Sequence, residues 1–376
     1  MDKKIKVVFA GGGTGGHVFP ALNLASAINE KWDASIKFFG TERGLEYTKV
    51  PSAGYELKII PVVGFQRRLT LKNLMFPFKL WNSLRICKQQ LKSLEPDIVI
   101  GTGGYVMGPV LKAAISLDIP TVIQEQNSYP GVTTRLLAPK ADLVFLAYAE
   151  AKKFLKNAKN IHVTGNPINL KKPVSGRSEI AADYGLKPNL KTILVFGGSQ
   201  GASSINNAVL QMIKNEKIPD GFQILWQTGK NEFDKYDLLL KKINSGKVVI
   251  KPFIDDMYNA YALADFAICR AGAMTLSELM AAGLPALLVP YPFAAADHQY
   301  KNAKMIEEKN AGMVVVDNKD MTEKICTMVN TIFVDQNRIK TFAMNMRSLH
   351  QPDTIDIILK RIELMLKQKN KWPFEN

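Results

Sequence analysis

The sequence is poor in cysteine and has no long apolar run. Its three cysteines, Cys87, Cys269 and Cys326, form no Cys-x-x-Cys pair, and the four histidines show no metal-ligand spacing, so a disulfide scaffold and a zinc site are not expected. No stretch of about 18 apolar residues occurs, which excludes a predicted membrane-spanning helix. The apolar run 5–10 is too short for a signal peptide and ends in glycine. We therefore expect a cytoplasmic protein.

Acidic residues are scarce relative to basic ones. The 376 residues include 34 Asp and Glu against 49 Lys and Arg, a formal net charge of +15. This balance indicates an anionic partner: nucleic acid, an acidic membrane surface or a phosphorylated substrate. The hydrophobic fraction of 47% and the charged fraction of 22% are ordinary for a folded protein, which argues against disorder.

Short β-branched runs alternate with helix-like stretches, and the pattern occurs twice. The first set comprises residues 5–10, 36–40, 57–61, 97–101, 121–124, 143–146 and 161–164. The second comprises 192–196, 223–226, 248–250, 266–269, 286–289 and 313–316. Apolar strands joined by helices predict parallel sheets covered on both faces. We predict two doubly wound, Rossmann-like α/β domains, 1–163 and 164–350, with residues 351–376 packing back on the first through a helix at 354–369.

Three glycine-rich loops follow predicted strands: GGGTGGH at 11–17, GTGGY at 101–105 and GGSQGA at 197–202. Glycines let the backbone approach a ligand closely, and the helix N-terminus that follows favours negative charge. A diphosphate or an oxygen-rich sugar is the expected ligand. Glycine loops in both domains favour a ligand held in a cleft between the carboxyl ends of the two sheets.

Other interpretations of these loops remain open. The first loop also matches G-x-G-x-x-G through Gly11, Gly13 and Gly16, and Glu42 lies near the place of a ribose-binding acid. A dinucleotide-dependent oxidoreductase is therefore an alternative. Any one loop alone also fits a tight strand–helix turn.

Two further stretches suit a sugar nucleotide. Residues 270–278, RAGAMTLSE, begin a helix directly after a strand, and its first amides would receive a diphosphate. Glu278 would accept hydrogen bonds from ribose hydroxyls, or would simply interact with the helix dipole. Gln299 and Asn302 are three residues apart and share a helix face, where amides suit sugar hydroxyls. The alternative for this stretch is helix capping by Asp297.

Taken together, the motifs resemble those of one family. They are GGGTGGHVFPALNLA (11–25), GTGGYVMGPV (101–110), EQN (125–127), GNP (165–167), GGSQGA (197–202), FIDDM (253–257), RAGAMTLSEL (270–279) and DHQYKNA (297–303). The chain resembles the MurG family of bacterial UDP-N-acetylglucosamine transferases. The resemblance implies a GT-B fold, no cofactor or metal, and inverting transfer of N-acetylglucosamine to the 4-hydroxyl of undecaprenyl-diphosphate-linked N-acetylmuramoyl-pentapeptide. This step converts lipid I to lipid II in peptidoglycan synthesis, and so serves cell-wall biogenesis, cell shape and division.

The resemblance also implies residue roles. Ser199 would contact the diphosphate, Ile254 the uracil, Glu278 the ribose and Gln299 the sugar. The full donor-binding set is Thr14, Gly15, Gly16, Asn127, Ser199, Ile254, Ala273, Met274, Thr275, Leu276, Ser277, Glu278, Gln299 and Asn302. The acceptor-binding set is Gly13, Thr14, Gly103, Gly104 and Tyr105.

One position departs from the family pattern. Asn169 stands where the family usually has arginine, two residues after the proline of GNP. The loss of a cation there bears on donor affinity rather than on reaction type, and Lys171 or Lys172 would be the substitute.

The chemistry requires a base for the acceptor hydroxyl. His17, at the end of the first glycine loop, is the candidate, because histidine titrates near neutral pH. Glu125 and Asp297 are rivals, and a lone histidine near a helix start is more often structural. The chain contains no D-x-D triplet, so backbone donors and a helix N-terminus are expected to stabilise the leaving UDP without a metal.

Residues 57–94 contain eight basic side chains and no acid. Leu71, Leu74, Met75 and Phe78 recur at helical spacing, and Pro77 is expected to kink or end a helix. A basic, apolar segment at 65–92 fits docking on an anionic leaflet, which predicts a peripheral protein on the cytoplasmic face of the plasma membrane. The alternative is a core-facing amphipathic helix.

Alternative functions also remain. Within enzymes, the alternative is another GT-B protein, such as a glycolipid transferase or a UDP-sugar 2-epimerase. The net charge alone suggests a nucleic-acid binder, but no motif supports one.

Overall fold

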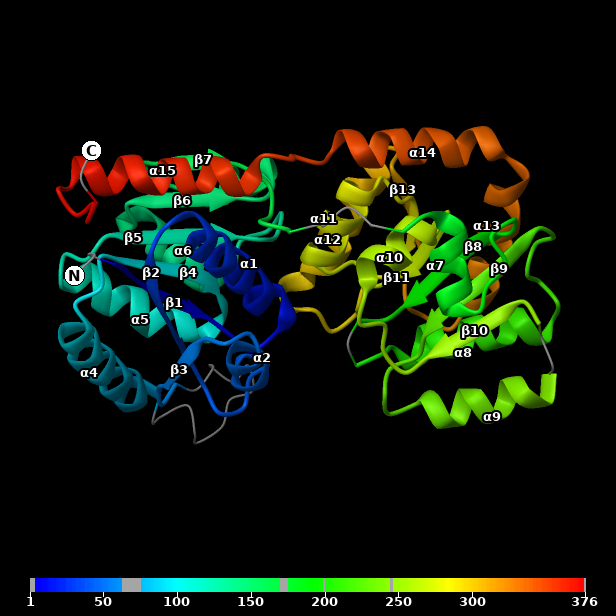
Figure 1. Ribbon diagram of the computed structural model, residues 1–376, viewed down its shortest axis with the longest axis horizontal. Helices are drawn as coiled ribbons and strands as arrows, with labels where there is room; N and C mark the ends of the chain where they lie inside the picture. Colours follow the sequence, from blue (N-terminus) through cyan, green and yellow to red (C-terminus); the bar gives the residue numbers. More distant parts are fainter. Residues whose placement is uncertain (1–3, 63–75, 170–174, 199, 244–245, 375–376) are drawn as a thin grey trace. The chain divides into compact units, whose positions relative to one another are not determined.

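The computed structural model describes residues 4–62, 76–169, 175–198, 200–243 and 246–374 (Figure 1). It divides into two compact units. Unit 1 comprises Met1–Asn169 with Gln351–Asn376, and unit 2 comprises Leu170–His350. Each unit is built on its own parallel sheet, which confirms the predicted pair of doubly wound α/β folds.

Unit 1 contains a seven-stranded parallel sheet in the order β3-β2-β1-β4-β5-β6-β7. The strands are β1 (Ile5–Gly11), β2 (Ala34–Gly40), β3 (Glu56–Ile59), β4 (Ile98–Gly103), β5 (Thr121–Glu125), β6 (Leu143–Leu146) and β7 (Ile161–Val163). The chain runs outward from β1 to β3 and then returns to β4 on the other side of β1. Ligands bind at such switch points, and two of the glycine loops lie at the ends of β1 and β4.

Helices cover both faces of this sheet. They are α1 (Gly15–Lys31), α2 (Glu46–Ser52), α4 (Phe76–Leu94), α5 (Gly104–Ser116), α6 (Val132–Leu137) and α15 (Thr354–Gln368), with 3-10 turns at Ala138–Lys140 and Ala149–Phe154. Successive residues of β1 alternate between two apolar cores. Val7 and Phe9 pack with α1 and α15, whereas Val8 and Ala10 pack with α4 and α5. Residues from α15 therefore complete the core of unit 1.

Unit 2 contains a six-stranded parallel sheet in the order β10-β9-β8-β11-β12-β13. Its strands are β8 (Lys191–Phe196), β9 (Phe222–Gln227), β10 (Val248–Lys251), β11 (Phe266–Cys269), β12 (Ala286–Leu288) and β13 (Gly312–Val314). Its helices are α7 (Arg177–Tyr184), α8 (Ser203–Lys214), α9 (Phe233–Ile243), α10 (Met257–Leu263), α11 (Ala273–Ala282), α12 (His298–Glu308), α13 (Met321–Val334) and α14 (Gln336–Ser348), with a 3-10 turn at Ala295–Asp297. The strand order reverses between β8 and β11, which places the switch point there.

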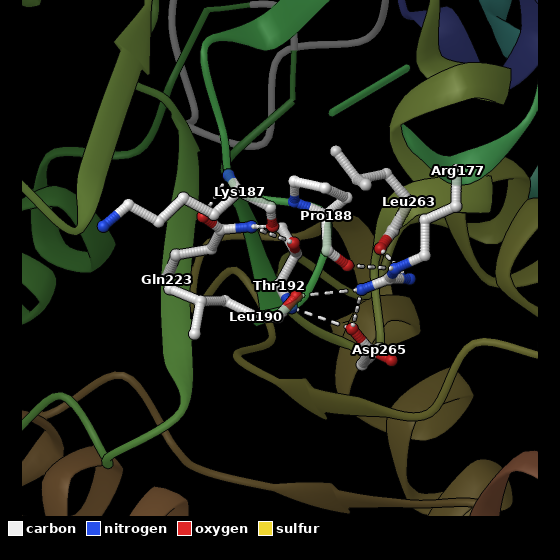
Figure 2. Close-up of polar contacts among 8 residues, drawn as sticks. All are labelled: Arg177, Lys187, Pro188, Leu190, Thr192, Gln223, Leu263 and Asp265. Carbon is white, nitrogen blue, oxygen red and sulfur yellow. Dashed lines mark hydrogen bonds and ion pairs between the residues drawn. The ribbon is translucent and has the colours of Figure 1, made fainter. Parts of the chain in front are cut away.

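A polar cluster closes the amino end of the unit 2 sheet (Figure 2). The guanidinium of Arg177 forms a 2.8 Å ion pair with Asp265 and donates to the carbonyls of Leu263 and Leu190. Asp265 also accepts from the backbone N–H of Thr192 at 2.8 Å. Each of these groups has a partner within the protein, so this end of the sheet is built for stability.

Two helix boundaries differ from the sequence-based expectation. Helix α1 begins at Gly15 rather than Val18, so the glycine loop itself forms the first turn. Helix α4 is described from Phe76 and continues through Pro77 to Leu94, so Pro77 does not end a helix there. Leu71, Leu74 and Met75 lie outside the described residues.

None of the helices within the described ranges combines the length and the apolar composition that crossing a bilayer requires.

Candidate functional site

In unit 1, the loops that follow β1 and β4 are in direct contact. A Cβ on Gly11 would lie 1.9 Å from the hydroxyl oxygen of Thr102, and one on Gly104 would lie 2.4 Å from the carbonyl oxygen of Gly12. Gly13, Gly103 and Gly104 have positive φ angles of 90°, 110° and 75°, which other residues rarely adopt. Glycine is therefore required here because the two loops pack closely and three of the residues have positive φ angles.

His17 is held between these loops. Its Nδ1 lies 3.0 Å from the carbonyl oxygen of Thr102 and 3.0 Å from Oε1 of Gln126. The amide nitrogen of Gln126 donates to the carbonyls of Thr102 and Gln124, so its oxygen faces the ring. Because both neighbours of Nδ1 are acceptors, Nδ1 carries the proton and the lone pair is on Nε2. A Cβ on Gly103 would lie 2.5 Å from Nδ1, so this ring position also requires glycine.

The two rival bases have different surroundings. Glu125 is buried, and it accepts from the backbone and side-chain amides of Asn127 and from the N–H of Gly131, each at 3.1 Å. It therefore shapes the loop that carries Asn127. Asp297 is exposed and precedes α12 with a φ of 57°, and its side chain makes no capping hydrogen bond. The helix-capping interpretation of Asp297 is therefore wrong, because this left-handed backbone does not aim the carboxylate at the first turn.

Glu46, which the sequence analysis missed, anchors the first glycine loop through a hydrogen bond to its backbone. It is fully buried, and its Oε2 accepts from the N–H of Gly13 at 2.7 Å. Its Oε1 accepts from the N–H and the hydroxyl of Thr41 at 3.1 and 2.9 Å. The hydroxyls of Thr41 and Tyr105 are 3.1 Å apart, which extends the network to the second loop. The sequence drew attention to Glu42 instead, and that side chain is exposed.

The GNP motif connects the same region to the C-terminal segment. The amide of Gln124 donates to Oδ1 of Asn166 at 2.9 Å, and Asn166 donates to the carbonyl of Gln126. The hydroxyl of Thr354 donates to the carbonyl of Thr164. Asn169, which replaces the family's usual arginine, is half-buried, and Lys171 and Lys172 lie outside the described residues.

In unit 2, helix α11 begins immediately after β11 with Gly272 as its N-cap. Most of its predicted contact residues are buried: Ala273, Met274, Leu276 and Ser277. Ser277 bonds back to the carbonyl of Ala273 at 3.0 Å. These side chains build the core, so what they offer a ligand is the backbone amides of the first turn. The side chains of Thr275 and Glu278 are half-buried.

Glu278 lies one turn further along this helix and is paired with Tyr261. The Tyr261 hydroxyl donates to Oε2 at 2.7 Å. Burial raises the pKa of Glu278, and the hydrogen bond from Tyr261 acts in the opposite direction. Burial, followed by the charge of Glu278, raises the pKa of Tyr261 well above its ordinary value. The half-buried carboxyl group of Glu278 therefore has a perturbed pKa and a tyrosine hydroxyl as its partner.

Arg270, also missed from the sequence, ties several strand ends together. It forms a 2.7 Å ion pair with Asp317, with only 12% and 14% of the two side chains exposed. It also donates to the hydroxyl of Ser204 at 2.8 Å and to the carbonyls of Val289 and Pro290. The contacts join the ends of β11 and β12 to the start of α8 and to the segment after β13. Arg270 thus positions the carboxyl edge of this sheet.

The two amides of α12 have different environments. Oε1 of Gln299 accepts from the backbone N–H of Tyr291 at 2.9 Å, and the side chain is half-buried. Asn302 is fully buried. Of the two side chains, only that of Gln299 is partly exposed. Ser199 lies outside the described residues.

Across the described ranges, no three His, Cys, Asp or Glu side chains are grouped so that they could hold a metal ion.

Comparisons with known proteins match both units. The glycosyltransferase family 28 N-terminal domain matches residues 7–146, and the family 28 C-terminal domain matches residues 192–356. A relative from Acetivibrio thermocellus is 37% identical over 366 residues, with 97% of this chain and 99% of the relative covered. One from Christiangramia forsetii is 41% identical over 372 residues, with 98% and 100% covered. Both are named UDP-N-acetylglucosamine--N-acetylmuramyl-(pentapeptide) pyrophosphoryl-undecaprenol N-acetylglucosamine transferase.

Solved structures agree with this result. The crystal structure of MurG from Acinetobacter baumannii superposes with a TM-score of 0.76 at 28% identity, covering 96% of this chain and 99% of that one. A UDP-N-acetylglucosamine 2-epimerase superposes with a TM-score of 0.64 at 16% identity, with 98% of each chain covered, a likeness of fold alone. The chain therefore belongs to glycosyltransferase family 28 and, within it, to the MurG family of UDP-N-acetylglucosamine transferases.

Proposed function

We propose that the chain transfers N-acetylglucosamine from UDP-N-acetylglucosamine to the 4-hydroxyl of undecaprenyl-diphosphate-linked N-acetylmuramoyl-pentapeptide, with inversion at the anomeric carbon. This is the step from lipid I to lipid II in peptidoglycan synthesis. The observation that carries the proposal is the similarity over nearly the whole chain to transferases of that name. The paired sheets, each with a glycine loop at its switch point, supply the framework.

Unit 1 would supply the base and the acceptor site. The acceptor 4-hydroxyl gives its proton to Nε2 of His17 as its oxygen attacks the anomeric carbon. The bond from that carbon to the UDP oxygen breaks, and UDP leaves with the electron pair. The hydrogen bonds from Nδ1 hold the ring in the tautomer whose Nε2 is unprotonated and can accept a proton. The proposed acceptor contacts are Gly13, Thr14, Gly103, Gly104 and Tyr105.

Unit 2 would hold the donor. The first amides of α11 and the loop 197–202 receive the diphosphate, where the helix N-terminus stabilises the charge that develops on UDP. Glu278 binds the ribose, Ile254 the uracil and Gln299 the sugar. Asn302 supports α12 from within the core. The proposed donor contacts from unit 1 are Thr14, Gly15, Gly16 and Asn127.

Helix α4 is the proposed membrane contact on the cytoplasmic face of the plasma membrane. One side of it, with Cys87 and Leu91, packs in the core of unit 1. On its other side, Phe78 and Trp81 are 70% and 64% exposed. Lys79, Arg85, Lys88 and Lys92 are exposed on the same helix. Exposed aromatic and basic side chains together suit an anionic bilayer surface.

Vesicle flotation tests the docking. We expect the protein to float with vesicles rich in anionic phospholipid and to remain in solution with neutral ones. Replacing Trp81 by Ala should weaken flotation, whereas Lys367→Ala on α15 serves as a charge-loss control. Equal binding to neutral and anionic vesicles would contradict the electrostatic part.

The transfer reaction itself is tested with radiolabelled UDP-N-acetylglucosamine and a lipid-linked muramoyl-pentapeptide acceptor. We expect label in the lipid product, and little or none from UDP-glucose. If label fails to reach the acceptor, or if both donors work equally well, the proposal is wrong. Titration with NAD provides the check on the oxidoreductase alternative.

A further inference from the structure

Gln227 is the last residue of β9, a strand that lies between β8 and β10 in the sheet of unit 2. It pairs with Phe196 of β8 on one side and with Lys251 of β10 on the other. The glycine loop 197–202 follows β8, and the segment 252–256 follows β10. The two loops thus leave the sheet on either side of Gln227.

The side chain of Gln227 bonds to both loops. It is 3% exposed. Its Nε2 donates to the carbonyl of Gly198 at 3.0 Å, and its Oε1 accepts from the backbone N–H of Ile254 at 2.8 Å. A carbonyl on one side and an N–H on the other allow only one orientation of the amide. The side chain of Gln227 therefore links the two loops directly.

The glycine loop depends on this end of β9 in a second way. A Cβ on Gly201 would lie 2.1 Å from the carbonyl oxygen of Thr228, and one on Gly229 would lie 2.4 Å from the carbonyl oxygen of Gln200. The loop is thus packed directly on the residues that follow Gln227. Movement of this strand end would move the loop with it.

We propose that Gln227 is a positioning residue for the donor, because it links the proposed diphosphate-binding loop 197–202 to the proposed uracil-binding segment 252–256. The inference rests on the proposed function, which assigns those two loops to UDP. Gln227 touches neither ligand group in this account. It acts by holding two loops at the spacing that one nucleotide requires.

Gln223 offers a matched control on the same strand. It lies four residues earlier, so it points to the same face of the sheet, and it is also buried. Its amide donates to the carbonyl of Lys187 at 2.8 Å and to the hydroxyl of Thr192 at 3.1 Å, and its oxygen accepts from the N–H of Lys187 at 2.9 Å (Figure 2). These contacts lie at the amino end of the sheet, away from both loops.

The test compares Gln227→Met with Gln223→Met, since methionine has a similar length and cannot make these hydrogen bonds. Affinity for UDP, affinity for uridine, the melting temperature and the KM of each substrate are measured for both variants and the wild type. We expect both variants to lose melting temperature. Only Gln227→Met should lose UDP affinity, by about tenfold or more, with a similar rise in donor KM and an unchanged acceptor KM.

Gln227→Glu separates the two hydrogen bonds. Its carboxylate keeps the acceptor for Ile254 but puts an oxygen against the carbonyl of Gly198. We expect uridine affinity to stay within about threefold of wild type while UDP affinity falls at least as far as in Gln227→Met. This variant also provides the comparison if Gln227→Met does not fold.

Two results would overturn the inference while leaving the proposed function intact. One is wild-type UDP affinity in both Gln227 variants. The other is an equal loss of UDP affinity in Gln227→Met and Gln223→Met, which would show general destabilisation. If the wild-type protein binds no UDP, the proposed function fails together with this inference.

Discussion

The glycine loops of units 1 and 2 follow the same strand–loop–helix pattern, but opposite chemistry anchors them. In unit 1, the buried carboxylate of Glu46 accepts the N–H of Gly13. In unit 2, the neutral amide of Gln227 donates to the carbonyl of Gly198. The carboxylate of Glu46 therefore occupies a backbone N–H of its loop and places negative charge beside it. The amide of Gln227 occupies a backbone carbonyl of its loop and adds no charge.

This difference separates the roles of the two units. An anion is favoured by N–H groups that point outward and is disfavoured by a nearby buried carboxylate. We therefore propose that the loop in unit 2 holds the donor diphosphate. The loop in unit 1, with His17 at its end, suits hydroxyl groups and proton transfer. The predictions below test this division.

The largest effect is expected from His17→Ala in unit 1. Removing a general base lowers turnover by about 10²–10⁴-fold, whereas UDP affinity should stay near wild type because the proposed contacts to the diphosphate, ribose and uracil are in unit 2. Turnover against pH and UDP titration by calorimetry measure the two quantities. Near-normal turnover with an unchanged pH profile would mean that His17 is not the base.

Glu46→Gln tests the charged anchor in unit 1. An amide NH₂ would face an N–H donor of Gly13 or Thr41, which leaves a buried polar group unsatisfied. We expect the free energy of unfolding to fall by about 1–3 kcal/mol, and turnover to fall by roughly 10–100-fold as the loop shifts. Denaturant unfolding and transfer assays measure these changes. The exposed Glu42→Gln is the control, and an equal effect there would remove Glu46 from this role.

Glu278→Gln sharpens the comparison from the donor side. We expect UDP affinity to fall by about tenfold through the loss of charged hydrogen bonds to the ribose, with acceptor KM unchanged. Calorimetry with UDP and steady-state kinetics follow the two quantities. Unchanged UDP affinity would exclude the ribose role.

The raised pKa of Glu278 also predicts how the stability of the ligand-free protein depends on pH, and the same variant tests this prediction. Because burial raises the pKa of Glu278, the folded wild type retains this proton to higher pH than the unfolded chain. The wild type therefore loses stability as pH rises from the ordinary glutamate pKa of 4.5 through the raised value. Glu278→Gln should gain stability relative to wild type over that window and show no gain below it. Melting temperatures of the wild type and Glu278→Gln are compared from pH 4 to 8. A difference between them that does not change with pH would contradict the prediction.

The smallest expected effect is that of chelation. If backbone amides and a helix N-terminus in unit 2 stabilise the leaving UDP, thorough treatment with EDTA should leave turnover unchanged within error. Turnover before and after chelation, with added Mg²⁺ as the control, decides this. Loss of turnover in EDTA with rescue by Mg²⁺ would show that the backbone amides and the helix N-terminus of unit 2 do not stabilise the leaving UDP without a metal.

Much of the fold follows from local sequence. Alternating apolar runs predicted both sheets, because strands buried on both faces must be apolar throughout. Helix boundaries were less accurate. The start of α1 moved to Gly15 because a glycine loop can itself form a first helical turn, and α4 continues through Pro77, where a helix was expected to kink or end.

By itself, the sequence determined two doubly wound units, their glycine loops and the family to which the chain belongs, because these depend on neighbouring residues. Only the tertiary structure decided which side chains hold the loops in place. Glu46 lies 33 residues from Gly13, and Gln227 lies 29 residues from Gly198. No local pattern marks such partners, since it is the parallel sheet that brings distant strand ends to one edge.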